Sequence, residues 1–286
     1  MKRTGDYLVN QAIIPAAGVG ARMLPITKAL PKEMLPIGRK PVIQYILEEL
    51  ASAGVTKALI IVSDGKEMIE KYFGDGRNLG LRCEYLLQRQ MKGSGNAILE
   101  AESWTDHKPF VVAWGDCIST VKPQNTQAEL PVPLARLIHT FDLLRPDFAV
   151  LAKRLRGIKA ATPRRLRYTL LPRQQTLTDA APAKPFDLLE ISKHLGLDPI
   201  PDNSIVTAAR WILSEGIFPF LRMLRDQSQE EILLTEAARL WLNVGARARA
   251  VPLLDQESIE DMGTWKSYLN ASARYATLDP EYDPSP

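Results

Sequence analysis

The sequence predicts an α/β fold, a three-layer α/β/α sandwich built on a mixed, mostly parallel, Rossmann-like sheet. In roughly the first 120 residues, short apolar runs of strand length alternate with stretches of amphipathic, helical spacing. A strand, a helix and a strand at these intervals indicate parallel pairing through right-handed crossovers. These two observations together predict a doubly wound sheet.

The apolar pattern also places the individual elements. The expected strands are buried apolar runs at residues 12–16, 58–62, 85–87, 110–114 and 205–213. The expected helices lie at residues 41–52, 96 to about 104, 231–242 and 265–275. Gly54 stands just beyond the first helix as a stop signal.

A basic stretch at residues 153–173 interrupts this pattern. It holds eight basic residues together with Pro163 and Pro172, which favours a solvated loop or hairpin outside the sheet. A more specific hypothesis is that some of its arginines bind the phosphate group of a sugar phosphate or the surface of a partner. Nucleic acid is the weakest of the three interpretations, because Tyr168 is the single aromatic platform among these charges.

Composition excludes several classes of protein. The chain has 286 residues and a net charge of +3, which suits small anionic substrates but falls short of a nucleic-acid binder. No run approaches the ~20 apolar residues of a membrane span, and residues 1–10 lack the apolar core of a signal peptide. Cys83 and Cys117 cannot form a disulfide framework. We therefore expect a cytoplasmic protein that binds neither nucleic acid nor membrane.

The strongest chemical signal is the segment AIIPAAGVGARMLPITKALPKEMLPI, which begins at Ala12. An apolar strand runs into a loop in which Gly18 and Gly20 allow close backbone approach to a ligand, and free N–H groups there can hold phosphate oxygens. Arg22 and Lys32 add fixed positive charge to offset a leaving pyrophosphate. Neither the dinucleotide fingerprint nor the Walker loop fits this spacing.

This segment resembles the signature of bacterial UTP–glucose-1-phosphate uridylyltransferases, within the wider sugar nucleotidylyltransferase family. The family pattern is Gly-x-Gly-Thr-Arg followed by Pro, Thr-Lys and Pro-Lys-Glu-Met-Leu-Pro, and the chain departs from it at Ala21, where threonine is usual. The resemblance implies that Arg22 and Lys32 handle the triphosphate as the catalytic residues. It also implies nucleotide contacts from the backbone of Ala17, Gly18 and Gly20.

Further matches follow in the expected order. Gln88 and the glycine-containing loop at Gly93 are similar to the family's base-recognition segment, and a glutamine amide can satisfy the imide edge of uracil. Asp116 comes directly after an apolar strand, where ligands gather in parallel sheets. The resemblance makes Asp116 and Asp261 ligands of Mg²⁺, an ion that prefers carboxylate oxygens. Glu231 and Thr235 are expected to position a helix near the site rather than to do chemistry.

The sugar side departs from the family more. The resemblance implies contacts to the sugar phosphate from Gly115, Glu190 and Lys193, of which Lys193 is displaced by two positions. Thr169 and Ala209 stand where the family has glycine, and Ile191 with Ser192 replaces another family pair. Side chains added beside a closely held sugar can cost ~1–3 kcal/mol, which is enough to change substrate preference.

The resemblance implies an enzyme that joins UTP to a sugar 1-phosphate and releases pyrophosphate in one in-line displacement. Glucose 1-phosphate is the expected sugar substrate. We expect one domain at residues 1–275, with a nucleotide-binding half at 1–125, a sugar-binding half with C-terminal helices at 126–275, and a flexible tail at 276–286. The resemblance also implies a homo-oligomer. Two alternatives stay open: a related enzyme for another nucleotide or sugar phosphate, and a non-catalytic nucleotide-binding paralogue.

Overall fold

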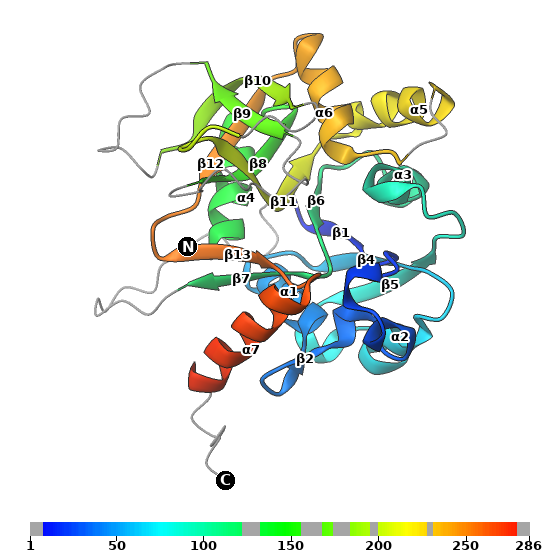
Figure 1. The fold of residues 1–286 in the computed structure, drawn as a ribbon. Helices are drawn as coiled ribbons and strands as arrows, with labels where there is room; N and C mark the ends of the chain where they lie inside the picture. Colours follow the sequence, from blue (N-terminus) through cyan, green and yellow to red (C-terminus); the bar gives the residue numbers. More distant parts are fainter. Residues whose placement is uncertain are drawn as a thin grey trace.

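The computed structural model describes residues 8–121, 132–155, 168–173, 184–194, 200–227 and 231–278. The strands of its main sheet are β1 (Gln11–Pro15), β4 (Lys57–Val62), β5 (Arg82–Leu87), β6 (Phe110–Ala113), β8 (Phe148–Arg154), β9 (Tyr168–Pro172), β10 (Phe186–Lys193), β11 (Ile205–Leu213) and β12 (Ala248–Pro252). Two small sheets pair β2 (Pro36–Ile37) with β3 (Lys40–Pro41), and β7 (Cys117–Val121) with β13 (Glu257–Asp261). The main sheet is mixed, as predicted, and runs through both halves of the chain (Figure 1).

The expectation of a mostly parallel sheet holds for the first half, whereas among the described strands of the second half only β8 and β12 pair in parallel. In the first half β5, β4, β1 and β6 lie side by side in parallel. β11 then pairs antiparallel with β6, β8 and β9, and β10 pairs antiparallel with β12 and β9. Between β8 and β11 the described residues form strands and no helix, and parallel neighbours need a long crossover that this region does not supply.

The second half of the sheet closes on itself. Ile205 of β11 pairs with Leu170 of β9, so that β11, β8, β12, β10 and β9 form a ring at the top of Figure 1. The α/β class is therefore confirmed, whereas this closed ring was not predicted. It replaces the open sheet edge that a simple sandwich would have.

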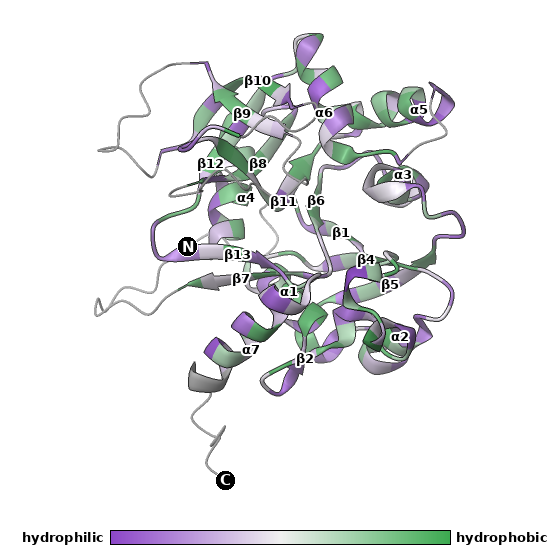
Figure 2. Cartoon of the chain, viewed as in Figure 1, coloured by the Kyte–Doolittle hydropathy of each residue, from purple (hydrophilic) through white to green (hydrophobic). Residues whose placement is uncertain are grey.

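Helices cover both faces of the sheet. They are α1 (Val42–Ser52), α2 (Glu67–Phe73), α3 (Gly93–Glu100), α4 (Pro133–Leu144), α5 (Phe218–Gln227), α6 (Leu234–Asn243) and α7 (Trp265–Leu278). One apolar cluster contains residues of α1 and α4, and a second contains residues of α3, α5 and α6. The central strands are mostly apolar, while the helices alternate between apolar and polar residues (Figure 2).

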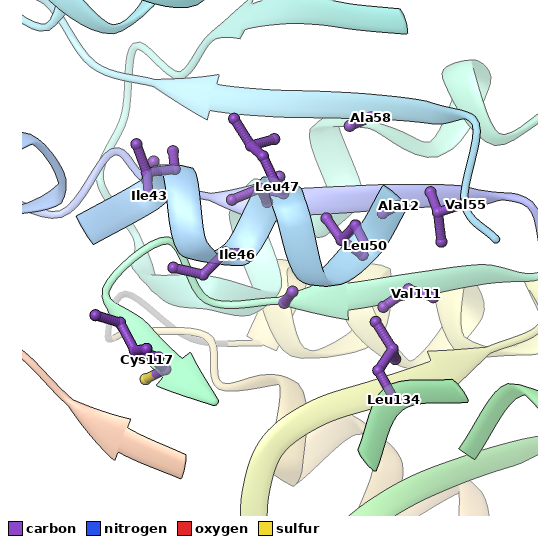
Figure 3. Close-up of a cluster of buried hydrophobic side chains, with 14 of the residues drawn as sticks. Ala12, Ile43, Ile46, Leu47, Leu50, Val55, Ala58, Val111, Cys117 and Leu134 are labelled. Atoms are coloured by element: carbon purple, nitrogen blue, oxygen red, sulfur yellow. The ribbon is translucent and has the colours of Figure 1, made fainter. Parts of the chain in front are cut away.

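Helix α1 shows why the apolar spacing at residues 41–52 correctly predicted a helix. Ile43, Leu47 and Leu50 are fully buried and lie over the strands that carry Ala12 and Ala58 (Figure 3). Small side chains on those strands let the helix approach closely, and burying each large side chain contributes ~1.5–3 kcal/mol. Gly54 follows the helix with a φ of 92°, which confirms the stop signal.

Several boundaries differ from the prediction. Strand β5 begins at Arg82 rather than at residue 85, and α6 begins at Leu234 rather than at residue 231. The helix expected from residue 96 begins at Gly93, and after Glu100 it gives way to a 3₁₀ turn at Glu102–Thr105. Helix α7 continues to Leu278, past the proposed domain end at residue 275. Most of the basic stretch, residues 156–167, and the tail from residue 279 lie outside the described residues. In the described part of the chain, no helix combines the length and apolar character that crossing a membrane requires.

Candidate active site

The loop after β1 lies at the carboxyl end of the parallel strands, where such sheets bind ligands. Gly20 has a φ of 68°, and a Cβ added there would lie 2.9 Å from Cγ2 of Thr27. The Thr27 hydroxyl donates a 3.0 Å hydrogen bond to the Gly20 carbonyl. Gly20 is therefore required by the turn itself, while Gly18 faces the Lys32 ammonium at 3.7 Å from its would-be Cβ.

The two predicted acids come together through the small β7–β13 sheet. In its register Asp261 pairs with Cys117, the residue after Asp116. The Met262 N–H also donates a 2.8 Å hydrogen bond to the Asp116 carbonyl. As a result, ligand atoms of Asp116, Cys117 and Asp261 all lie within 4.8 Å of one another.

The two predicted cations pair with these acids. Nη1 of Arg22 lies 3.6 Å from Oδ2 of Asp261, and the Lys32 ammonium contacts Oδ2 of Asp116 directly. Burial lowers the pKa of Lys32, but the Asp116 and Glu33 carboxylates outweigh it and raise that pKa to about 12. Burial alone would raise the pKa of Asp116, and Lys32 holds it below its usual range. The four charged residues predicted to handle the triphosphate and the metal thus form one cluster.

The donor atoms of this cluster fit a divalent cation of the Mg²⁺ type. Asp116 and Asp261 offer carboxylate oxygens, and Mg²⁺ takes one or two of these together with waters and phosphate oxygens. Burial, followed by the two carboxylates, raises the pKa of Cys117 well above its usual range, so its sulfur stays protonated. The structure therefore supports a divalent metal held by oxygen ligands, without specifying which ion.

Gln88 lies directly after β5 at the same edge of the sheet. Its backbone N–H donates a 2.7 Å hydrogen bond to the Val62 carbonyl. Its side chain is buried, and among the described residues the amide nitrogen Nε2 has no hydrogen-bond partner. A buried amide donor without a partner is costly, which favours a ligand in the adjoining cavity of about 300 Å³, lined also by Val19 and Lys66.

The structure shows why position 93 is a glycine, which the sequence did not reveal. Its φ is 88°, and a Cβ there would lie 2.5 Å from the carbonyl oxygen of Ile232. Backbone hydrogen bonds of 2.8 Å join Lys92 to Ile232 and Ile232 to Gly95. The segment at Glu231 therefore holds the loop at Gly93 in place.

Glu190 and Lys193, two of the residues predicted for the sugar side, form a second group on β10, and Glu236 of α6 contacts this group. Glu190 is exposed on β10, and the Lys193 ammonium lies 3.6 Å from Oε2 of Glu236. Glu236 also accepts a 2.7 Å hydrogen bond from the Tyr168 hydroxyl. Thr169, at a position where the family has glycine, is buried with its hydroxyl 2.9 Å from Nε2 of His194.

Gly115, the third residue predicted to contact the sugar phosphate, directly precedes Asp116 in the chain. Its N–H donates a 3.2 Å hydrogen bond to the Pro15 carbonyl. A Cβ there would lie 3.2 Å from Cβ of Ala16 and 3.4 Å from Cγ of Glu33. The structure thus assigns Gly115 a packing role between β6 and the loop, beside Asp116.

Sequence analysis did not single out the buried ion pair of Lys66 and Glu33 beside this site. Nζ of Lys66 lies 2.7 Å from Oε2 of Glu33, and both side chains are buried. Burial lowers the pKa of Lys66 and raises that of Glu33, and each group's charge partly offsets the shift of the other. A usable signal was present, because Lys66 follows β4 at the same carboxyl edge as Asp116.

Comparison with known proteins agrees with this geometry. A model of the nucleotidyl transferase family matches residues 11–129. The UTP–glucose-1-phosphate uridylyltransferase YngB of Bacillus subtilis (strain 168) is 30% identical over 253 residues, which cover 81% of this chain and 78% of that protein. UTP–glucose-1-phosphate uridylyltransferase 2 of Staphylococcus saprophyticus is 29% identical over 294 residues, covering 95% and 93%.

A solved structure shows the same likeness. The crystal structure of UDP-glucose pyrophosphorylase complexed with UDP-glucose superposes with a TM-score of 0.77 at 26% identity, covering 95% of this chain and 100% of that one. The chain therefore belongs to the nucleotidyl transferase family. The resemblance to UTP–glucose-1-phosphate uridylyltransferases that the motifs implied is confirmed.

Proposed function

We propose that the chain transfers a uridylyl group from UTP to glucose 1-phosphate, which gives UDP-glucose and pyrophosphate. The observation that carries this proposal is the convergence of Arg22, Lys32, Asp116 and Asp261 beside a glycine loop. The names of the relatives and the UDP-glucose bound by the structural neighbour support the choice of base and sugar.

In the proposed reaction an oxygen of the sugar phosphate attacks the α-phosphorus of UTP. The bond from that phosphorus to the bridging oxygen breaks, and pyrophosphate leaves. On substrate binding, Arg22 leaves Asp261 and binds the departing β- and γ-phosphates. Lys32 leaves Asp116 and binds oxygens at the reacting phosphorus. Positioning and charge stabilisation of this kind dominate phosphoryl-type transfer.

We propose that Mg²⁺ is the cofactor. Asp116 and Asp261 would hold it after the side chains of Lys32 and Arg22 have left them to bind phosphate oxygens. Bound there, the ion would supply positive charge to the phosphate oxygens. Before substrate binds, contact with Asp116 and Glu33 raises the pKa of Lys32 to about 12, so its ammonium is charged at neutral pH. Gln88 and the backbone of Ala17, Gly18 and Gly20 would hold the base and phosphates, with Gly93 shaping that loop.

Glu190 and Lys193 are the proposed sugar-side residues, with Gly115 shaping the site near Asp116. The contact of Lys193 with Glu236, at 3.6 Å, keeps its ammonium on the sugar side of the molecule. Thr169 and Ala209 are the positions at which preference for a different sugar would arise, since both carry side chains where the family has glycine.

Crossing nucleotides with sugar phosphates tests this proposal. Wild-type protein with Mg²⁺ is given UTP, dTTP or GTP together with glucose, hexosamine or uronic acid 1-phosphate, and pyrophosphate is measured. UTP with glucose 1-phosphate should give the fastest release. A faster rate with another combination would reassign the substrates, whereas UTP binding by calorimetry without release from any combination would favour the non-catalytic alternative.

We make three further proposals, on cellular location, assembly and fold. We place the protein in the cytoplasm, which suits its two free, buried cysteines. We assign it as a homo-oligomer on the family resemblance, to be measured by light scattering. We propose that the fold is a three-layer α/β/α sandwich, supported by two apolar clusters, one with residues of α1 and α4 and one with residues of α3, α5 and α6.

A further inference from the structure

The Lys66 side chain has three acceptors at hydrogen-bond distance and none of them belongs to a substrate. Its ammonium donates to the carbonyl of Ala16, to the carbonyl of Gly18 at 2.8 Å, and to Oε2 of Glu33 at 2.7 Å. An ammonium has three N–H donors, so these three contacts use them all. The side chain is also buried, with 8% of its surface exposed.

Two of these contacts fix the orientation of the glycine loop. In a trans peptide the C=O and the following N–H point in opposite directions. Holding the carbonyls of Ala16 and Gly18 toward Lys66 therefore turns the N–H groups of Ala17 and Val19 away from it. Among the described residues, neither N–H donates a hydrogen bond within the protein, which leaves both free for a ligand.

The third contact links the loop to the metal side of the site. Glu33 lies between two lysines, with Oε2 on Lys66 and Oε1 at 3.8 Å from the Lys32 ammonium. Lys32 in turn contacts Asp116. Buried charges are tolerated when they are paired in this way, and removal of one partner leaves the others uncompensated.

We infer that Lys66 is a positioning residue for the nucleotide: it sets the loop at Ala16–Gly18 so that backbone N–H groups face the UTP, and it does so without touching substrate. This inference rests on the proposed function for the identity of the nucleotide. It predicts that loss of Lys66 weakens the binding of UTP specifically and leaves the handling of the sugar phosphate unchanged.

The test compares Lys66→Met with Arg136→Met in the full chain. Arg136 is a matched control because it pairs with the fully buried Glu257 carboxylate, at the end of β13 opposite Asp261, and has no contact with the loop at Ala16–Gly18. Calorimetry gives the Kd for UTP with Mg²⁺, thermal unfolding gives stability, and steady-state kinetics gives KM for each substrate. Lys66→Gln, which keeps two donors without the charge, replaces Lys66→Met if the latter does not fold.

Lys66→Met should raise the Kd and KM for UTP at least about tenfold, the usual cost of losing an outer support of a binding group, with KM for glucose 1-phosphate changed less than about twofold. Arg136→Met should lose stability and keep its UTP affinity. An unchanged Kd for UTP in the Lys66 variant, or an equal loss in both variants, would overturn the inference. If wild type binds UTP without turnover, the proposed function fails while this comparison of Kd values still stands.

Discussion

At the scale of single residues, Ala209 carries a backbone strain that its sequence neighbours do not. Its φ is 52°, in the left-handed region, and the pairing of β11 with β8 shifts register between Thr207 and Trp211 around it. A side chain in this conformation costs ~1–2 kcal/mol relative to glycine. The bulge therefore explains why the family's glycine suits this position.

Replacing Ala209 by glycine should accordingly be tolerated better than the same change one residue earlier. Ala208 is buried on the same strand without a positive φ. We expect Ala208→Gly to lose about 1–2 kcal/mol more unfolding free energy than Ala209→Gly, measured in urea. Equal losses in the two variants would show that the bulge is not strained.

The raised pKa of Lys32 predicts how the free energy of unfolding depends on pH. Its pKa rises from 10.5 in the unfolded chain to about 12 in the folded protein, because the pull of Asp116 and Glu33 exceeds the cost of burial. A raised pKa contributes stability that is present in full below pH 10.5 and is lost as the pH rises through about 12. The shift corresponds to about 2 kcal/mol.

Urea unfolding between pH 8 and pH 12 of wild type and Lys32→Met checks this. The advantage of wild type over the variant should shrink by most of this ~2 kcal/mol as the pH rises to 12. Lys40→Met, which removes a half-exposed lysine paired with Glu48, is the control. A wild-type advantage that stays constant with pH would mean that Lys32 gains no charge stabilisation from the cluster.

At the scale of elements, the start of α3 is fixed by its contact with the segment before α6. A Cβ on Gly95 would lie 2.7 Å from Cγ2 and 3.0 Å from the carbonyl oxygen of Ile232. That oxygen accepts the 2.8 Å hydrogen bond from the Gly95 N–H, so it cannot move away freely. Two effects therefore oppose each other in Gly95→Ala: better helix propensity and a steric clash.

We expect the clash to win. Alanine improves helix propensity by about 1 kcal/mol, while overpacking costs about 1–3 kcal/mol. Gly95→Ala should therefore lower the free energy of unfolding and weaken UTP binding, because the loop that carries Gln88 and Gly93 is displaced. A variant more stable than wild type by about 1 kcal/mol would contradict this packing.

The elements also show what the sequence could and could not predict. The β1 loop, α1 and Asp116 followed from local patterns, because an apolar run and the residues just after it are adjacent in the chain. The approach of Asp261 to Asp116 depends on the β7–β13 pairing between distant segments, and only the family resemblance suggested it. Lys66 follows β4 at the same carboxyl edge as Asp116, but a lone lysine there matches no motif, so its position in the chain was the one available signal.

At the scale of the whole molecule, a buried ion pair joins the two halves. Nη2 of Arg210, on β11, lies 2.6 Å from Oε2 of Glu49, on α1, and it donates a 2.8 Å hydrogen bond to the Cys117 carbonyl. Arg210 is fully buried. Together with the continuous sheet, this pair supports our proposal that residues 1–275 form one domain with two functional halves.

Arg210→Met tests that proposal. Removal of one partner of a buried pair leaves an uncompensated charge, so we expect a loss of about 3–5 kcal/mol. The double variant Arg210→Met with Glu49→Met should recover much of this loss, since neither charge then remains. Urea unfolding followed by tryptophan fluorescence and circular dichroism should give one coincident transition in every case, and two separate transitions would show two independent domains.

The proposed catalytic cluster is tested most directly by pyrophosphate release from UTP and glucose 1-phosphate with Mg²⁺, comparing wild type with Asp116→Asn. Asp75→Asn is the control, because Asp75 is an exposed residue paired with Arg77. Wild type and the control should release pyrophosphate at equal rates, and Asp116→Asn should be slower by about 10²–10³-fold, the usual cost of losing one preorganised electrostatic contact. Equal rates for wild type and Asp116→Asn would contradict the assignment of this cluster as the catalytic centre.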